Sequence, residues 1–271
     1  MKKAIYFIFS AFLVANVLAA CGKGKETDNG GQHTLDFDSI VIDTMAHLTN
    51  SKTSPIVEIH LNIKYAKGKN ADIINDSLLR SGILSPDYIS LMPSKLSVAN
   101  ALDSFATKFV QDYKRDFGIL YAQDTEHATA YRVQYSNNTF LTQGKNGILN
   151  YFSHSYSYSG GAYGMDVLLV KNIDGKTGKI LKPTDVFVPG FEQPLADMIV
   201  EKLCDLYQVK NLKGLQEKGI FQNMEPYATD NFVLGRDGVD FIYCDSEIAP
   251  HAVGQIKISF SYDDVEKVLK K

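Results

Sequence analysis

The central part of the chain reads Tyr151-Phe-Ser-His-Ser-Tyr-Ser-Tyr158, then Ser159-Gly-Gly-Ala-Tyr-Gly164, then Met165-Asp-Val-Leu-Leu-Val-Lys-Asn-Ile173. The alternation in the first piece is typical of an antiparallel strand with one solvated face. We interpret the glycine cluster as a tight connection or bulge, with an anion-binding or peptide-binding turn as the alternative. It lacks the GxxxxGK[ST] pattern of a phosphate loop. These residues therefore predict two strands joined by a turn.

The segment before this unit predicts a hairpin, two helices and further strands. In residues 55–65 the apolar side chains alternate with polar ones, which places His60 on the polar face of a strand. The longest helix is expected over residues 94–117, with Ser94 as its cap. The other elements expected here are strands at residues 37–48, 130–135, 139–142 and 148–158, and a helix within residues 71–84.

The segment after it begins with a turn. Residues 174–178 predict a hairpin turn rather than a calcium loop, because Lys176 occupies a coordinating position and Pro183 the twelfth position. Helices are expected at residues 192–207 and 211–219, strands at 232–234, 239–243 and 255–261, and a terminal helix from Asp263. This order predicts an α+β fold of two consecutive units, each an antiparallel sheet plus helix, at residues 35–150 and 151–271, packed as one or two domains.

The N-terminus predicts a membrane anchor. Lys2 and Lys3 precede a short apolar run, which ends in Leu18-Ala-Ala-Cys21. This pattern resembles that of bacterial lipoproteins: residues 1–20 would be the signal peptide and Cys21 the lipidated residue. A retained anchor or a buried helix is the alternative. Residues 21–34 predict a flexible tether that begins at the lipidated Cys21. We therefore expect a protein of the bacterial cell envelope that is bound to the membrane through lipid on Cys21, at the periplasmic or surface face of the outer membrane.

Composition excludes several classes of protein. The 271 residues are 45% hydrophobic and 22% charged, with a net charge of −3, which fits neither a disordered chain nor a polytopic membrane protein. No long cluster of basic residues is present, so nucleic acid is not an expected partner. No CxxC or HExxH spacing occurs, and we expect no metal, no cofactor and no catalytic residue. Whether Cys204 and Cys244 form a disulfide stays open.

Three segments together resemble the RsiV-type domain family of unknown function. They are residues 160–164, residues 172–187, and Phe241-Ile-Tyr243 with the downstream residues 247–254, so that the resemblance covers roughly residues 151–271. Tyr163, Ser246 and His251 stand where the family often has histidine, tyrosine and tyrosine. Members occur in the outer part of a lysozyme-sensing anti-sigma factor and beside the catalytic domain of a peptidoglycan deacetylase. The metal-binding motifs of that catalytic domain have no counterpart in this sequence.

The resemblance implies an extracytoplasmic binding or sensing module, with a lysozyme-like protein or a peptidoglycan fragment as the partner. Its binding residues would be Gly160, Gly161, Tyr163, Gly164, Glu247 and His251. Two alternatives remain. One is a hydrolase acting on glycan, in which His154 or His251 works with a nearby carboxylate. The other is a purely structural envelope lipoprotein.

Overall fold

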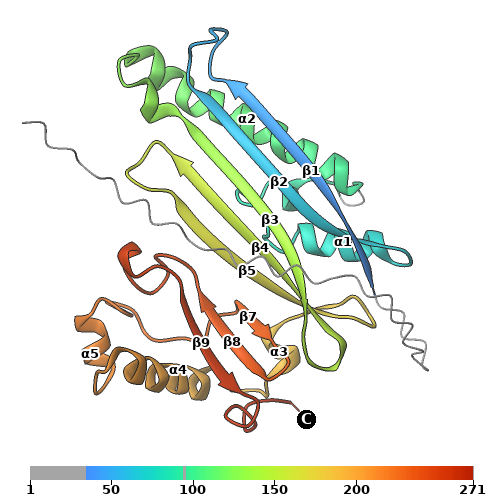
Figure 1. Ribbon diagram of the computed structural model, residues 1–271, viewed down its shortest axis with the longest axis vertical. Coiled ribbons are helices and arrows are strands. Elements are labelled where there is room, and N and C mark those ends of the chain that lie inside the picture. Colours follow the sequence, from blue (N-terminus) through green and yellow to red (C-terminus); the bar gives the residue numbers. More distant parts are fainter. Residues whose placement is uncertain (1–34, 94–95, 271) are drawn as a thin grey trace, which may run out of the picture. The chain divides into compact units, whose positions relative to one another are not determined.

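The computed structural model describes residues 35–93 and 96–270, which form an α+β fold with two sheets (Figure 1). The first sheet has six strands in the order β1 to β6, and the second has three in the order β7 to β9. The strands are β1 (Asp36–His47), β2 (Ile56–Lys67), β3 (Val133–Gln143), β4 (Ile148–Ser159), β5 (Met165–Asp174), β6 (Ile180–Leu181), β7 (Phe232–Leu234), β8 (Gly238–Tyr243) and β9 (Ile256–Ser261). The α-helices are α1 (Ala71–Leu79), α2 (Val98–Gln123), α3 (Pro183–Val186), α4 (Glu192–Tyr207) and α5 (Leu212–Glu217). Short 3-10 helices lie at η1 (Ile89–Leu91), η2 (Ala128–Tyr131), η3 (Lys145–Gly147) and η4 (His251–Val253).

The six-stranded sheet contains both parallel and antiparallel pairs, whereas the sequence pattern predicted antiparallel pairing throughout. β1 and β2 form the expected hairpin, but β3 runs parallel to β2, with Val133 beside Val57. The reason is the helical crossover: α1 and α2 return the chain to the starting end of β2 before β3 begins. β3, β4, β5 and β6 then pair antiparallel. The expected boundary between residues 150 and 151 lies inside β4, and this sheet continues to Leu181.

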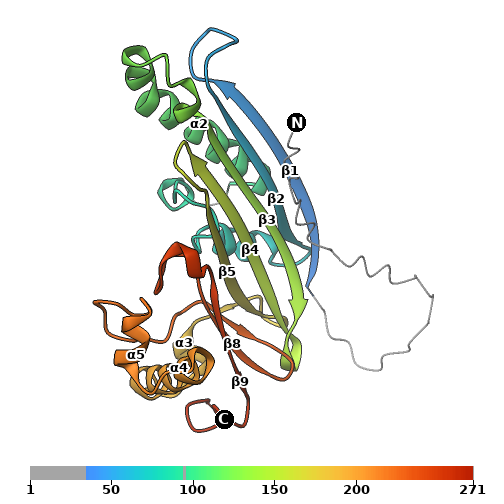
Figure 2. The same ribbon diagram turned by 60° about the vertical axis from the view of Figure 1, so that its left-hand side comes forward.

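The helices α1 and α2 cover one face of the six-stranded sheet (Figure 2). Leu102 and Phe105 of α2 are buried in the same core as Leu61 and Ile63 of β2. α2 begins at Val98, with the Ser97 hydroxyl accepting a hydrogen bond from the N–H of Asn100. The predicted start at residue 94 was therefore wrong, and Ser94 itself lies outside the described residues. The helix also continues past residue 117 to Gln123.

The three-stranded sheet has its own core. Leu195, Ile199 and Leu203 of α4 are buried there together with Phe232 of β7 and Phe241 of β8. The predicted bounds of α4 and β7 were confirmed. The prediction of a terminal helix from Asp263 was wrong. Turns follow β9, and Leu269 then forms an antiparallel β-bridge with Phe187.

Asparagine side chains join the two sheets. Asn172 of β5 donates a hydrogen bond to the carbonyl of Phe232 and accepts one from the N–H of Leu234, both at 2.9 Å. Asn150 of β4 donates to the carbonyl of Leu234 at 3.2 Å. Asn231 accepts from the N–H of Val170 at 2.8 Å and donates to the carbonyl of Leu168 at 2.7 Å. These side-chain amides hydrogen-bond to backbone N–H and C=O groups that would otherwise lack partners where the two sheets pack together.

Cys204 and Cys244 are free thiols, the first buried in α4 and the second half-buried just after β8. Burial raises the pKa of both thiols. Because both thiols are free, no disulfide joins Cys204 to Cys244. Across the part of the chain that the structure describes, no helix combines the length and the apolar character needed to span a bilayer.

Candidate binding surface

The turn between β4 and β5 carries four of the residues predicted to bind a partner. Gly160 has φ = +77°, and a Cβ atom there would lie 1.8 Å from the carbonyl oxygen of Ala130. A Cβ on Gly164 would lie 2.3 Å from the ring of Tyr156. Gly161 has ordinary space, since the nearest atom would be 3.7 Å away. Gly160 and Gly164 therefore fix the path of the turn, and Tyr163 projects from it with 62% of its surface exposed.

A second loop, residues 244–254, contains Glu247 and His251. The carboxylate of Glu247 accepts hydrogen bonds from the Tyr227 hydroxyl and from the N–H of Cys244, both at 2.7 Å. Burial raises the pKa of Tyr227, and its hydrogen bond to Glu247 adds to this rise, so the phenol remains a donor. Glu247 thus stabilises its own loop rather than offering a free carboxylate to a partner.

The two loops meet at Tyr163 and His251. Their rings stack with centroids 3.9 Å apart and planes inclined by 9°. The Nδ1 atom of His251 lies 2.6 Å from a carboxylate oxygen of Asp245, and the Asp245 side chain is only 8% exposed while that of His251 is 37% exposed. Asp245 therefore orients the imidazole of His251 through Nδ1, and the ring of Tyr163 covers one face of that imidazole. We call Tyr163 and His251 the stacked pair.

The six predicted residues thus have different roles in the structure. Tyr163 and His251 stack at the protein surface, Gly160 and Gly164 shape the turn that carries Tyr163, and Glu247 holds the second loop. Gly161 makes no comparable contact. Sequence reasoning missed Asp245, because the six-residue spacing to His251 matches no motif and only the folded loop brings the side chains together.

The other candidate histidine, His154, lies on β4 with Nε2 at 2.9 Å from an oxygen of Asp166 on β5. Both side chains are largely exposed. Neither His154 nor His251 lines the two cavities of about 510 and 530 Å³ beside the six-stranded sheet. Among the described residues, no group of three His, Cys, Asp or Glu side chains is placed to hold a metal ion. The pairs that His154 and His251 form with aspartates therefore lie outside these two cavities.

Comparison with known proteins finds similarity to a family of unknown function. A crystal structure of a DUF3298 family member from Bacteroides fragilis has a TM-score of 0.75 and 24% identity, covering 88% of this chain and 94% of that chain. A DUF3298 family protein from Pseudomonas aeruginosa PAO1 has a TM-score of 0.59 and 16% identity, covering 88% of this chain and 96% of that chain. No curated protein matches the sequence. Residues 184–263, which contain Glu247 and His251, match the family described as "Protein of unknown function (DUF3298)".

Proposed function

We propose that this chain is a non-enzymatic binding or sensing module of the bacterial envelope, with the stacked pair at the centre of its contact surface. The observation that carries the proposal is the stacking of Tyr163 on His251, which joins two loops from distant parts of the sequence. An exposed aromatic ring held in a fixed position is the kind of group that dominates protein interfaces, since it loses little conformational freedom on binding.

The surroundings of the stacked pair support a binding role. Gly160 and Gly164 determine the path of one loop, and Asp245 and Glu247 hold the other. A surface that is rigid before binding pays a smaller entropic cost when a partner docks. The expected partner is a lysozyme-like protein or a peptidoglycan fragment, as the RsiV-type resemblance of these two loops implies. The net charge of −3 favours a basic protein over an acidic one.

The test is calorimetric titration of the chain from residue 22 onward with c-type lysozyme and, separately, with solubilised peptidoglycan. Saturable binding to one of them is expected. Tyr163→Ala and His251→Ala should each weaken it by about tenfold or more, because both remove the stack. Leu206→Ala, an equally exposed apolar position on α4, is the matched control and should leave binding unchanged. Absence of binding to both probes would refute the proposed partner class.

Attachment to the membrane is the second part of the proposal and rests on the sequence around Cys21. In a bacterial host that processes lipoproteins, the native chain should incorporate labelled fatty acid and sediment with membranes. Cys21→Ser should abolish the label, whereas Cys204→Ser, which removes a buried thiol, should retain it. Equal labelling of native and Cys21→Ser chains would contradict the anchor.

A further inference from the structure

A groove of about 530 Å³ lies on the helix-covered side of the six-stranded sheet. β4 and β5 form its floor, α2 forms one wall, and the loop before η1 forms the other. Its floor reaches Ser159 and Met165, the two residues that flank the turn carrying Tyr163. The stacked pair does not contribute to the lining, so the groove is a separate site.

Serine hydroxyls line one side of the floor. The register of β4 puts Ser155, Ser157 and Ser159 on the same face as Ser153. Ser153 is buried and uses its hydroxyl for the carbonyl of Ile83 and for Asn137. Within residues 35–93 and 96–270, the other three hydroxyls have no hydrogen-bond partner. They form a row of groups that can both donate to and accept from a ligand.

Apolar and aromatic side chains complete the groove. Met165, Val167 and Leu169 of β5 continue the floor beside the serines, and the half-buried rings of Tyr88, Phe109 and Phe117 stand on the walls. Burial and the neighbouring Asp112 carboxylate raise the pKa of Tyr88, so its hydroxyl stays protonated. A ligand in this groove therefore meets flat apolar faces and hydroxyl groups at the same time.

The negative charges of the lining are paired with cations that lie just outside it. Asp112 and Asp116 of α2 are the charged residues of the lining, and no Lys, Arg or His belongs to it. Both carboxylates are ion-paired with Arg115, and Asp112 also lies 2.9 Å from the Lys108 ammonium. An anionic ligand would find no cation and would face these carboxylates, while a cationic ligand would have to compete with Arg115. The groove consequently favours a neutral ligand.

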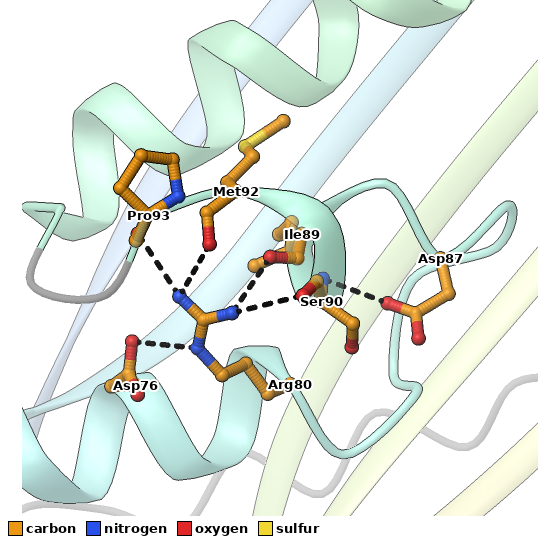
Figure 3. Close-up of polar contacts among 7 residues, drawn as sticks. All are labelled: Asp76, Arg80, Asp87, Ile89, Ser90, Met92 and Pro93. Atoms are coloured by element: carbon orange, nitrogen blue, oxygen red, sulfur yellow. Dashed lines mark hydrogen bonds and ion pairs between the residues drawn. The ribbon is translucent and has the colours of Figure 1, made fainter.

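The loop wall is held in place before any ligand binds. Arg80 at the end of α1 donates to the carbonyls of Ile89 and Pro93, both at 3.0 Å, and pairs with Asp76 at 2.9 Å (Figure 3). It also reaches the carbonyls of Ser90 and Met92. One guanidinium therefore holds the whole segment from Ile89 to Pro93 against α1.

The part of the loop that lines the groove is fixed by the sheet. The carbonyl of Ile83 accepts from Asn137 at 2.7 Å and from Ser153 at 2.9 Å, and the N–H of Ser85 donates to the Tyr135 hydroxyl at 3.1 Å. Asn137 and Ser153 are fully buried. Burying such polar groups is costly unless they form hydrogen bonds, and here both donate to the carbonyl of Ile83 in the groove wall. The groove is thus preorganised, which lowers the cost of binding.

From these features we infer that the groove binds a short neutral saccharide. The flat apolar faces of sugar rings would lie on the aromatic walls, and their hydroxyls would hydrogen-bond to the row at Ser155, Ser157 and Ser159. Its volume of about 530 Å³ is within the range of small-ligand pockets. The inference does not rest on the stacked pair, because neither Tyr163 nor His251 lines the groove.

The test uses ligand-detected NMR and calorimetry on the chain from residue 22 onward, with two neutral trisaccharides: cellotriose and the β-1,4-linked trisaccharide of N-acetylglucosamine. We expect at least one to bind with a dissociation constant below about 10 mM. Ser155→Val and Ser157→Val should each weaken binding about fivefold through the loss of a hydrogen bond. Both keep a residue that strands accept, so the fold is retained.

Ser136→Val is the matched control, because Ser136 pairs with Tyr156 and so points to the opposite face of the sheet. It should bind the trisaccharide as the native chain does, and so should Tyr163→Ala, which affects only the stacked pair. Binding of neither trisaccharide overturns the inference. Equal affinity in the native, Ser155→Val and Ser157→Val chains overturns it as well.

Discussion

The side-chain oxygen of Asn172 accepts a hydrogen bond from the backbone N–H of Leu234 at 2.9 Å. A side chain of β5 thus provides β7 with the hydrogen bond that a neighbouring strand would otherwise make. The same amide donates to the carbonyl of Phe232. Asn172 is fully buried, so neither hydrogen bond competes with bulk water. This asparagine belongs to the Asn-x-Asp segment on which the family resemblance rests, and the structure gives it a role in joining the two sheets.

Asn172→Ala should destabilise the protein by about 2–4 kcal/mol, because it leaves the backbone groups of Phe232 and Leu234 buried without partners. Urea denaturation measures the free energy of unfolding. Asn138→Ala is the control, since Asn138 is exposed on β3, and should change that free energy by less than about 0.5 kcal/mol. Equal stability of the two variants would show that the amide does not join the sheets.

Gly160 and Gly161 are adjacent but should respond differently to the same substitution. Gly160→Ala introduces a Cβ into the carbonyl of Ala130 at a positive φ and should cost about 2–4 kcal/mol. Gly161→Ala adds a Cβ at ordinary van der Waals distance from the carbonyl of Tyr163 and should cost less than about 0.5 kcal/mol. Thermal unfolding of the pair checks this. A mild effect at Gly160 would mean that the turn can take another path.

Arg80→Met keeps an unbranched side chain that can pack as the arginine stem does, but it removes every hydrogen bond drawn from the guanidinium in Figure 3. We expect a loss of about 1–3 kcal/mol in the free energy of unfolding. Hydrogen exchange should also become faster in the loop segment from Ile89 to Met92, whose carbonyl groups the guanidinium holds. Lys52→Met, in an exposed turn, is the control. Unchanged exchange in this loop would argue against Arg80 as its support.

Acid should weaken the β5–β6 turn through Asp174. The N–H groups of Thr177 and Lys176 hydrogen-bond to its carboxylate and hold its pKa below the usual value of 3.8. A carboxylate with a depressed pKa stabilises the fold above its unfolded pKa, and this contribution is lost as pH falls through the folded value. Between about pH 5 and pH 2, the stability of Asp174→Asn should thus fall less steeply than that of the native chain.

Asp263→Asn, which changes an exposed aspartate in the turn after β9, is the control for this titration. Its stability should follow the native pH dependence. Parallel curves for the native and Asp174→Asn chains would show that the turn does not depend on this carboxylate.

Local pattern predicted much of the secondary structure. The apolar spacing of α4 and the short apolar run of β7 gave the correct bounds, because both depend on nearby residues. The parallel pairing of β2 with β3 could not be predicted in this way, since it depends on the path of the crossover. The turns after Asp263 could not be predicted either. The three-residue spacing of Val265 and Val268 is that of a helix face, but both side chains are buried where the chain returns to Phe187.

The candidate site was foreseen in part. The resemblance singled out both loops, but their contact depends on side chains that only the fold brings together. Glu247 stood out as a binding residue, whereas in the structure its carboxylate accepts hydrogen bonds from the N–H of Cys244 and from the Tyr227 hydroxyl. The groove had no sequence signal, because its lining comes from the loop before η1, from α2 and from the strands β3, β4 and β5, and its serines follow the ordinary alternation of a strand.

The central claim is that Tyr163 and His251 act together as a binding surface. The most direct measurement is calorimetric titration of c-type lysozyme, and of solubilised peptidoglycan, into the native, Tyr163→Ala and Leu206→Ala chains. We predict saturable binding of one probe to the native and Leu206→Ala chains, and affinity about tenfold lower or worse for Tyr163→Ala. Equal affinity in all three chains, or no binding of either probe to the native chain, would contradict the account.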